Sequence, residues 1–282
     1  MTNHGVYRAI FALLSAGLAA CGGGSGDDGL DATGGGGSSG SGSTTAVIRV
    51  HLTSSTAPVA QTDGLSGQTP LTYVTGIRSY KLLRSMADPS PATVFDLGKG
   101  FVEASYADGA DTLLATVPLA SIPEGKYAFA RVVHTHNRYR VKATLHDTTT
   151  LVGEFDDVFV LSNDTTLDGV VHAQGDFTYT FLYAGTKTPT SGTNGILPES
   201  TTMGGFTVVN EGGEWAYYFP VDMVIDHGPK DRDTYLRVNV FEAFRWQDEA
   251  KPGYLPGVFD VTASGYEPVK RFGANSYAVE VK

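Results

Sequence analysis

From residue 46 to the end of the 282-residue chain, apolar and polar residues alternate in short runs that turn residues separate. Residues 46–53 read AVIRVHLT, and residues 276–281 read SYAVEV. Alternation with a period of two places every second side chain on one face, which is typical of a half-buried β-strand. Turn chemistry such as Asp108-Gly109 lies between the runs. The chain is therefore predicted to be all-β, with an antiparallel β-sandwich as the simplest architecture.

Further runs of this kind cover residues 77–84, 112–119, 126–136, 138–145, 155–161, 176–183, 206–209, 215–221, 234–246 and 258–262. Aromatic and β-branched residues are concentrated in them, as strands favour. No amphipathic helix of useful length competes with this pattern.

The chain has a single cysteine, Cys21. Disulfides, thiolate metal sites and cysteine nucleophiles are therefore excluded for everything beyond it, so the stability of the domain must come from its core. The formal net charge of −10 argues against nucleic acid as a partner.

Residues 1–20 have the character of a signal peptide. One positive charge, Arg8, precedes the apolar segment 9–20. Because a transmembrane helix needs about 20 apolar residues, this segment is too short to span a bilayer, and a cleaved signal is favoured. The alternative, an ordinary secretory signal, would leave an exported chain with one unpaired reactive thiol.

The residues around the cysteine resemble the lipobox of bacterial lipoproteins: Leu18, Ala19 and Ala20 fill the three positions before Cys21. The resemblance implies cleavage before Cys21, a diacylglyceryl group on its sulfur and an acyl group on the new amine. It also implies a membrane anchor in the cell envelope. Gly22 resembles the class of lipoproteins sorted to the outer membrane, on its periplasmic or surface face. The covalent lipid is the only group that this resemblance supplies, and no other cofactor is expected from it.

Residues 21–45 are rich in glycine and serine and almost free of apolar side chains. Such a segment cannot offset its own ordering entropy by burying surface, so it is predicted to be a flexible tether with a reach of about 25 Å. Residues 46–282 are then expected to form one β-sandwich domain. The turn-rich stretch 185–205 is either a long surface loop or a seam between two subdomains.

Within that domain, three features resemble uncharacterised bacterial lipoprotein domains: the first strand near Val47, the sequence IPEGKY at residues 122–127, and a late strand rich in phenylalanine within residues 236–261. The resemblance implies an immunoglobulin-like or prealbumin-like β-sandwich. A jelly-roll-like sandwich is the third form that the strand pattern allows. The resemblance implies a fold and no activity.

His134 and His136 are the first candidate site. Residues i and i+2 of a strand share a face, so both imidazoles are positioned to bind one zinc or copper ion. His146 supplies a third ligand if residues 126–136 and 138–145 form a tight hairpin around Asn137. The tripeptide resembles the HxH of cupins and carbonic anhydrases, but the rest of those patterns is absent. In the alternative interpretation, the two histidines are partly exposed polar positions near the end of a strand.

Asp226, Asp231 and Asp233 are the second candidate site, because they lie in the acidic loop 222–233 and calcium prefers carboxylate oxygens. The loop lacks the spacing of an EF-hand, and solvated turns use the same residues. The loop is therefore interpreted either as a calcium site or as an ordinary surface turn.

Tyr218 and Trp246 are candidate ligand-binding aromatics. One of the adjacent Tyr217 and Tyr218 must face outward on a regular strand, and Trp246 precedes a polar stretch where a loop rim would begin. Tyrosine and tryptophan are enriched at interfaces, which favours a carbohydrate or protein partner. Strand composition alone also accounts for these residues.

No G-x-S-x-G nucleophile motif occurs in the predicted β domain, residues 46–282. We therefore expect a lipid-anchored cell-envelope protein without catalytic residues, acting as a binding or structural surface module. The alternative is a metal-dependent protein or enzyme centred on His134 and His136 or on the acidic loop 222–233.

Overall fold

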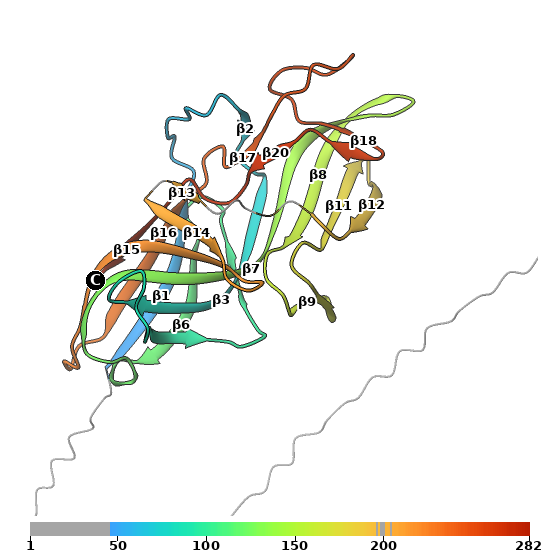
Figure 1. The fold of residues 1–282 in the computed structure, drawn as a ribbon. Helices are drawn as coiled ribbons and strands as arrows, with labels where there is room; N and C mark the ends of the chain where they lie inside the picture. Colours follow the sequence, from blue (N-terminus) through green and yellow to red (C-terminus); the bar gives the residue numbers. More distant parts are fainter. Residues whose placement is uncertain (1–45, 196, 198–200, 204) are drawn as a thin grey trace, which may run out of the picture. The chain divides into compact units, whose positions relative to one another are not determined.

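The structure is a computed structural model that describes residues 46–195, 197, 201–203 and 205–282 (Figure 1). The predicted lipobox, Cys21 and the predicted tether lie outside the described residues. Ser43–Lys282 forms one compact unit. In the part of the chain that is described, no helix has the length and apolar character needed to cross a membrane.

The described residues fold almost entirely into strands, as the alternating pattern predicts. The strands are β1 (Val47–Ser55), β2 (Ser66–Gln68), β3 (Thr72–Leu83), β4 (Ala92–Asp96), β5 (Val102–Ser105), β6 (Asp111–Pro118), β7 (Gly125–His146), β8 (Thr150–Val160), β9 (Thr165–Leu167), β10 (Val170–His172), β11 (Phe177–Tyr183), β12 (Thr186–Gly192), β13 (Thr201–Met203), β14 (Phe206–Asn210), β15 (Trp215–Ile225), β16 (Arg232–Asn239), β17 (Phe244–Trp246), β18 (Asp260–Thr262), β19 (Gly265–Tyr266), β20 (Val269–Arg271) and β21 (Ser276–Val281). A 3-10 turn, η1 (Leu119–Ser121), precedes β7.

Two sheets dominate the architecture. A four-stranded sheet has the order β21-β16-β1-β6, and a large curled sheet has the order β12-β11-β8-β7-β15-β14-β13, with β3, β4, β5, β18 and β19 attached to it. Most neighbours are antiparallel, while β1 with β16 and β7 with β18 are parallel. Small sheets β2-β17-β20 and β9-β10 complete the fold. The predicted all-β sandwich is confirmed.

The longest strand, β7, has 22 residues and pairs with β3 and β15 near its start and with β8 near its end (Figure 1). The predicted hairpin around Asn137 is therefore wrong. Asn137 is buried and pairs with Thr75 of β3 on one side and with Phe159 of β8 on the other. The hairpin turn lies instead at residues 147–149, so His146 is about 40 Å along the strand from His134.

A bulge near Asn137 explains the misleading signal. Between the pairs Thr75–Asn137 and Ile77–His134, β3 has one residue and β7 has two. The extra residue is accommodated at Gly76, where an added Cβ would lie 2.6 Å from Nδ1 of His136. Polar residues in the middle of β7 thus mark a bulge and a close backbone approach rather than a turn.

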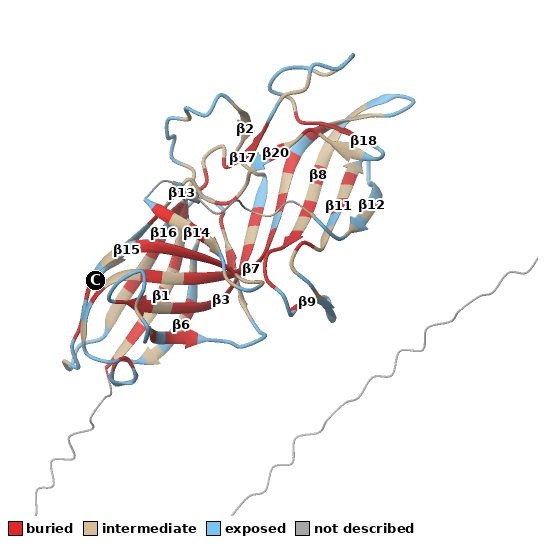
Figure 2. Ribbon diagram, viewed as in Figure 1, coloured by how far each residue is buried: buried red, intermediate tan, exposed pale blue. Residues whose placement is uncertain are grey.

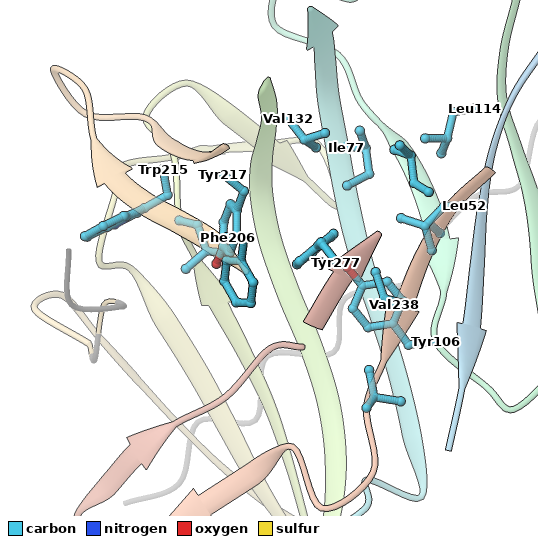
Figure 3. Packing of buried hydrophobic residues seen from close by; sticks show 14 of the residues in the cluster. Leu52, Ile77, Tyr106, Leu114, Val132, Phe206, Trp215, Tyr217, Val238 and Tyr277 are labelled. Atoms are coloured by element: carbon cyan, nitrogen blue, oxygen red, sulfur yellow. Dashed lines mark hydrogen bonds between the residues drawn. The ribbon is translucent and has the colours of Figure 1, made fainter. Parts of the chain in front are cut away.

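One continuous apolar core runs along β7. Figure 3 shows part of it, with Leu52 and Val238 from the four-stranded sheet and Ile77 and Val132 from the large sheet. The alternation that predicts the strands is visible in Figure 2, where buried and more exposed residues follow each other along β8 and β11. The more exposed residues of these strands form the outer face of the large sheet.

Candidate functional site

His134 lies in the buried core, and both of its ring nitrogens face protein side chains. Its Nδ1 is 2.8 Å from Oγ1 of Thr75, and its Nε2 is 3.1 Å from the hydroxyl of Tyr277. The Thr75 hydroxyl donates to Oδ1 of Asn137 (2.7 Å), so Nδ1 of His134 donates to Thr75 and Nε2 accepts from Tyr277. Tyr277 is in turn 3.0 Å from the hydroxyl of Tyr106. The imidazole is one link in a buried chain of hydrogen bonds.

This series of hydrogen bonds requires that the imidazole of His134 is neutral. Burial, followed by repulsion from His136, lowers the pKa of His134 to about 3. Both ring nitrogens already have hydrogen-bond partners, and the ring packs 4.3 Å from that of Tyr217. His134 therefore stabilises the core as a polar, uncharged side chain.

The other two histidines of the predicted site contact different residues. Nε2 of His136 is 3.3 Å from Oε1 of Glu103, and its ring meets Phe101 edge-on at 4.8 Å. Nε2 of His146 is 2.7 Å from Oδ1 of Asp260 at the far end of β7. Nowhere in the described residues does a group of three or more His, Cys, Asp or Glu side chains lie in position to hold a metal ion. The structure does not bring His134, His136 and His146 together.

The acidic loop is held by two arginines. Oδ2 of Asp231 is 2.6 Å from Nη2 of Arg49, and Oδ1 of Asp233 is 3.4 Å from Nη1 of the same residue. Asp226 forms a close ion pair with Arg232. A backbone hydrogen bond from Val47 and the Arg49 guanidinium lower the pKa of Asp231. These carboxylates fasten the ends of β1 and β16, and they do not converge on a common point.

Tyr218 and Trp246 are both buried, so the predicted exposed aromatic face is not formed by them. Tyr218 does point away from the main core, as predicted, but Arg131 covers it and donates to its hydroxyl from Nε at 3.1 Å. Trp246 packs against Phe259 at 5.4 Å and donates from Nε1 to Oδ1 of Asp248 at 3.1 Å. The polar residues after Trp246 satisfy its indole and do not form a rim around an exposed ring.

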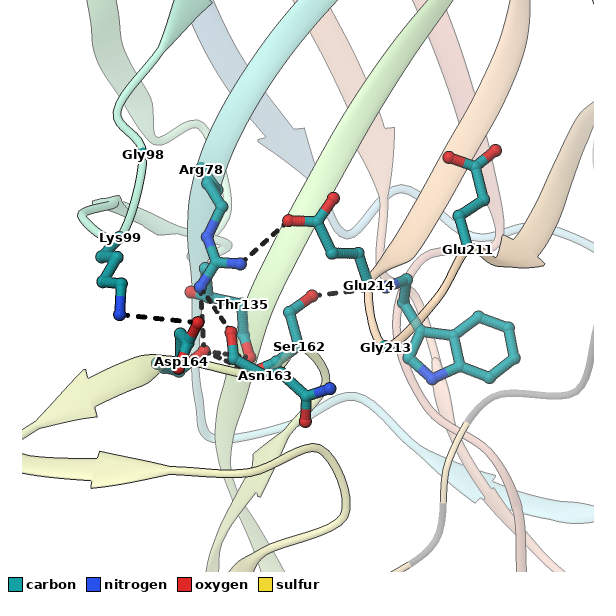
Figure 4. A network of polar contacts seen from close by, with 12 residues as sticks. Arg78, Gly98, Lys99, Thr135, Ser162, Asn163, Asp164, Glu211, Gly213 and Glu214 are labelled. Carbon is teal, nitrogen blue, oxygen red and sulfur yellow. Dashed lines mark hydrogen bonds and ion pairs between the residues drawn. The ribbon is translucent and has the colours of Figure 1, made fainter.

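A network of polar side chains seals the bulge of β7 (Figure 4). The buried Arg78 donates to Oε1 of Glu214 at 3.0 Å and to the carbonyl of Asn163 at 2.9 Å. Ser162 donates to the carbonyl of His134 at 2.6 Å. These bonds hold the β8–β9 loop against β7. The ion pair with Glu214 compensates the charge of the buried Arg78.

The outer face of β7, β8 and β11 carries a different set of side chains. Arg138, Arg140 and Lys142 alternate along β7 and share that face. In register, Arg140 lies opposite Asp156 of β8, and Asp156 lies opposite Thr180 of β11. Two hollows open on this face, one at each end of the row of cations.

The first hollow, which we call the apolar groove, has a volume of about 530 Å³ and lies between the β7–β8 hairpin and the loop before β18. Two of its aliphatic side chains are largely solvent-exposed, Val152 at 74% and Leu255 at 63%. The groove is lined by Gln68, Lys142, Ala143, Thr144, Thr150, Val152, Gly253, Leu255, Gly257, Val258, Phe259 and Asp260. Its volume falls in the range of small-molecule sites.

Hydrogen bonds fix the loop that forms one wall of the apolar groove. The backbone N–H of Leu255 donates to Oδ2 of Asp260 at 3.2 Å, and that of Gly257 donates to Oδ1 of Asp248 at 3.2 Å. His146 binds the other oxygen of Asp260 and packs 4.7 Å from the ring of Tyr254. The wall is thus built before any ligand arrives, which reduces the entropy lost on binding.

The second hollow, which we call the polar basin, has a volume of about 370 Å³ and is lined by Thr72, Arg138, Arg140, Asp156, Val158, Thr178 and Thr180. Arg140 is 2.8 Å from Oδ2 of Asp156 and 3.5 Å from Oε2 of Glu154. Among the described residues, no acidic side chain forms an ion pair with Arg138 or Lys142. Each hollow therefore has one unpaired cation.

Comparison with known proteins gives no match: no protein-family model, curated protein or solved structure corresponds to this chain. Its function must be argued from the residues and the two hollows.

Proposed function

We propose that this protein is a lipid-anchored cell-envelope binding module, and that the apolar groove is its ligand site. The observation that carries the proposal is the exposure of Val152 and Leu255 on the two walls of a groove of about 530 Å³. An apolar ligand that removes these aliphatic side chains from water lowers the free energy of the complex. The lipobox supports the location, since Leu18, Ala19 and Ala20 precede Cys21.

A binding role without catalysis is supported by the groups at the groove. Its one carboxylate, that of Asp260, already accepts hydrogen bonds from the Leu255 backbone and holds His146. The other lining residues are aliphatic side chains, glycines, threonines and Phe259, together with Lys142 and Gln68. Such a lining favours shape and burial over reaction chemistry.

Alkyl maltosides, whose headgroup is uncharged, test the groove. They are titrated, below their critical micelle concentrations, into a protein that comprises Ser43–Lys282. This segment is one compact unit with its own core. Affinity measured by calorimetry is expected to rise about fourfold for each added methylene until the groove is filled, because each buried methylene contributes about 0.8 kcal/mol.

Leu255→Asp is expected to weaken the binding of the decyl ligand at least about tenfold, since it places a charge in the groove. The matched control is Leu97→Asp, which alters another solvent-exposed leucine, at 42% exposure, in a turn outside the groove. An equal loss in both variants, or the absence of binding by every chain length, would contradict the proposed site.

The anchor is tested separately by Cys21→Ser in the producing cell. The variant is expected to lose the lipid mass and to leave the membrane fraction, or to remain unprocessed, while the β domain stays folded. Fractionation with mass measurement of the protein distinguishes these results. A Cys21→Ser protein that stays membrane-bound with the mass of the wild type would rule out lipidation at this residue.

A further inference from the structure

We propose that the ligand of the apolar groove is an amphiphile with an anionic headgroup, which lies along the outer face of β7 on Lys142 and Arg138. This inference rests on the proposed function, because it takes the groove as the site of the ligand's apolar tail. It adds the charge of the headgroup and the residues that recognise it.

The first argument is position. Lys142 lines the apolar groove, Arg138 lines the polar basin, and Arg140 lies between them on the same face. Alternate residues of a strand are about 6.6 Å apart, so the row spans about 13 Å. A ligand whose tail fills the groove therefore places its headgroup within reach of Lys142 first, and of the basin beyond it.

The second argument is charge. Glu154 lies opposite Lys142 in register, but its carboxylate pairs with Arg140 at 3.5 Å, and Asp156 pairs with the same guanidinium at 2.8 Å. Arg138 lies opposite Val158 and has no carboxylate in register. The three cations of this row therefore face two carboxylates, which leaves a local excess of one positive charge in a chain whose formal net charge is −10. A local excess of positive charge on an acidic protein favours an anionic ligand at this place.

The third argument is the chemistry of the basin. The guanidinium of Arg138 presents a planar fork of donors that matches a carboxylate, sulfate or phosphate. Thr178 and Thr180 add hydroxyls to the same hollow, next to the apolar Val158. The shared chemistry of the ligand is thus an oxyanion on an alkyl chain, either a carboxylate or an ester of sulfate or phosphate.

The experiment uses probes with the same decyl tail and different headgroups: decanoate, decyl sulfate, decyl maltoside and decyltrimethylammonium. Calorimetry at low salt is expected to rank at least one anionic probe about tenfold tighter than the maltoside, and the cationic probe weakest. The stronger of decanoate and decyl sulfate distinguishes a carboxylate from an ester headgroup. The anionic preference should weaken as salt is added, because exposed charges are screened.

Lys142→Gln and Arg138→Gln are each expected to reduce the affinity of the anionic probe about threefold to tenfold more than they reduce that of the maltoside. Lys126→Gln is the matched control, since Lys126 is an exposed lysine at the other end of β7 and pairs with Asp222. Its removal changes the net charge equally, yet it should not alter the affinity of any probe.

The outcomes separate the two proposals. Equal affinity for the anionic probes and the maltoside would overturn the headgroup inference and leave the groove intact as the ligand site. An equal loss in Lys126→Gln and Lys142→Gln would also overturn it, because the attraction would then be nonspecific. The absence of binding by all four probes would overturn the proposed function itself.

Discussion

His134→Ala is expected to lower the free energy of unfolding by about 3–5 kcal/mol. The substitution empties a fully enclosed position in the core, which has a cost comparable to truncating other large buried side chains. It also removes the acceptor of the Tyr277 hydroxyl and the donor to Thr75. A buried polar group that is left without a hydrogen-bond partner costs about 1–3 kcal/mol. The expected total change given above already includes part of this cost. Guanidinium unfolding at about pH 7.5 measures the change.

His136→Ala is the matched control for this prediction. His136 is also buried, but its Nε2 faces Glu103, a half-exposed residue at the edge of β5. We therefore expect a loss smaller than that of His134→Ala. If the two histidines instead served one metal ion, both substitutions would lower stability in the same metal-dependent manner. A change below about 1 kcal/mol in His134→Ala would contradict the role given to the buried chain of hydrogen bonds.

The second large effect is a loss of stability in acid. His134 has a folded-state pKa of about 3, whereas an unfolded histidine titrates near pH 6.5. Below about pH 6.5 the unfolded chain takes up a proton that the folded chain excludes. The contribution of His134 is therefore fully present above pH 6.5 and is lost progressively as the pH falls to about 3, by a total on the order of 5 kcal/mol.

Two other buried groups titrate alongside it. Burial lowers the pKa of His136, which adds to the loss in acid. Burial raises the pKa of Asp157 well above its usual value, so its contribution to stability is present below about pH 3.8 and is lost as the pH rises. The net dependence of the wild type on pH is a sum of these opposing terms. The contribution of His134 to the pH dependence is obtained by subtracting the unfolding free energy of a variant whose side chain at this position does not titrate.

His134→Gln provides that variant, since an amide side chain is polar and does not titrate near neutral pH. The difference in unfolding free energy between wild type and His134→Gln is expected to change steadily between about pH 6.5 and pH 3, with the wild type losing more. Urea unfolding at a series of pH values measures it. Parallel curves for the two proteins would show that His134 is not held neutral by the fold.

The sequence was sufficient for the strands because burial on one face imposes a local period of two. β1 and β21 are examples, in which Val47–Ser55 and Ser276–Val281 follow the predicted runs closely. β7 could not be predicted as one strand because asparagine is typical of turns, so Asn137 indicated a break between two strands. Its real partners, Thr75 and Phe159, come from distant parts of the chain. The run at 234–246 is likewise divided into β16 and β17, with Glu242 at a positive φ of 45° between them.

The candidate site was harder to predict than the fold, because a binding surface depends on which strands become neighbours. The spacing of His134 and His136 indicates a shared face only in a regular strand, and the bulge at Gly76 removes that regularity. Trp246 was expected at a rim because polar residues follow it, yet Asp248 is the partner of its indole. The apolar groove had one local signal, a leucine in the loop sequence GYLPGV at residues 253–258.

The most direct test of the ligand site is the map of backbone amide shifts in a nitrogen-15 NMR spectrum of Ser43–Lys282 as decanoate is added. The proposal predicts that the largest changes cluster at Lys142 and Thr144 of β7, at Val152 of β8, and in the loop from Gly253 to Phe259, and that they saturate with a single affinity. Changes centred on another part of the molecule, or shifts that increase linearly without saturation, would contradict the assignment of the apolar groove as the binding site.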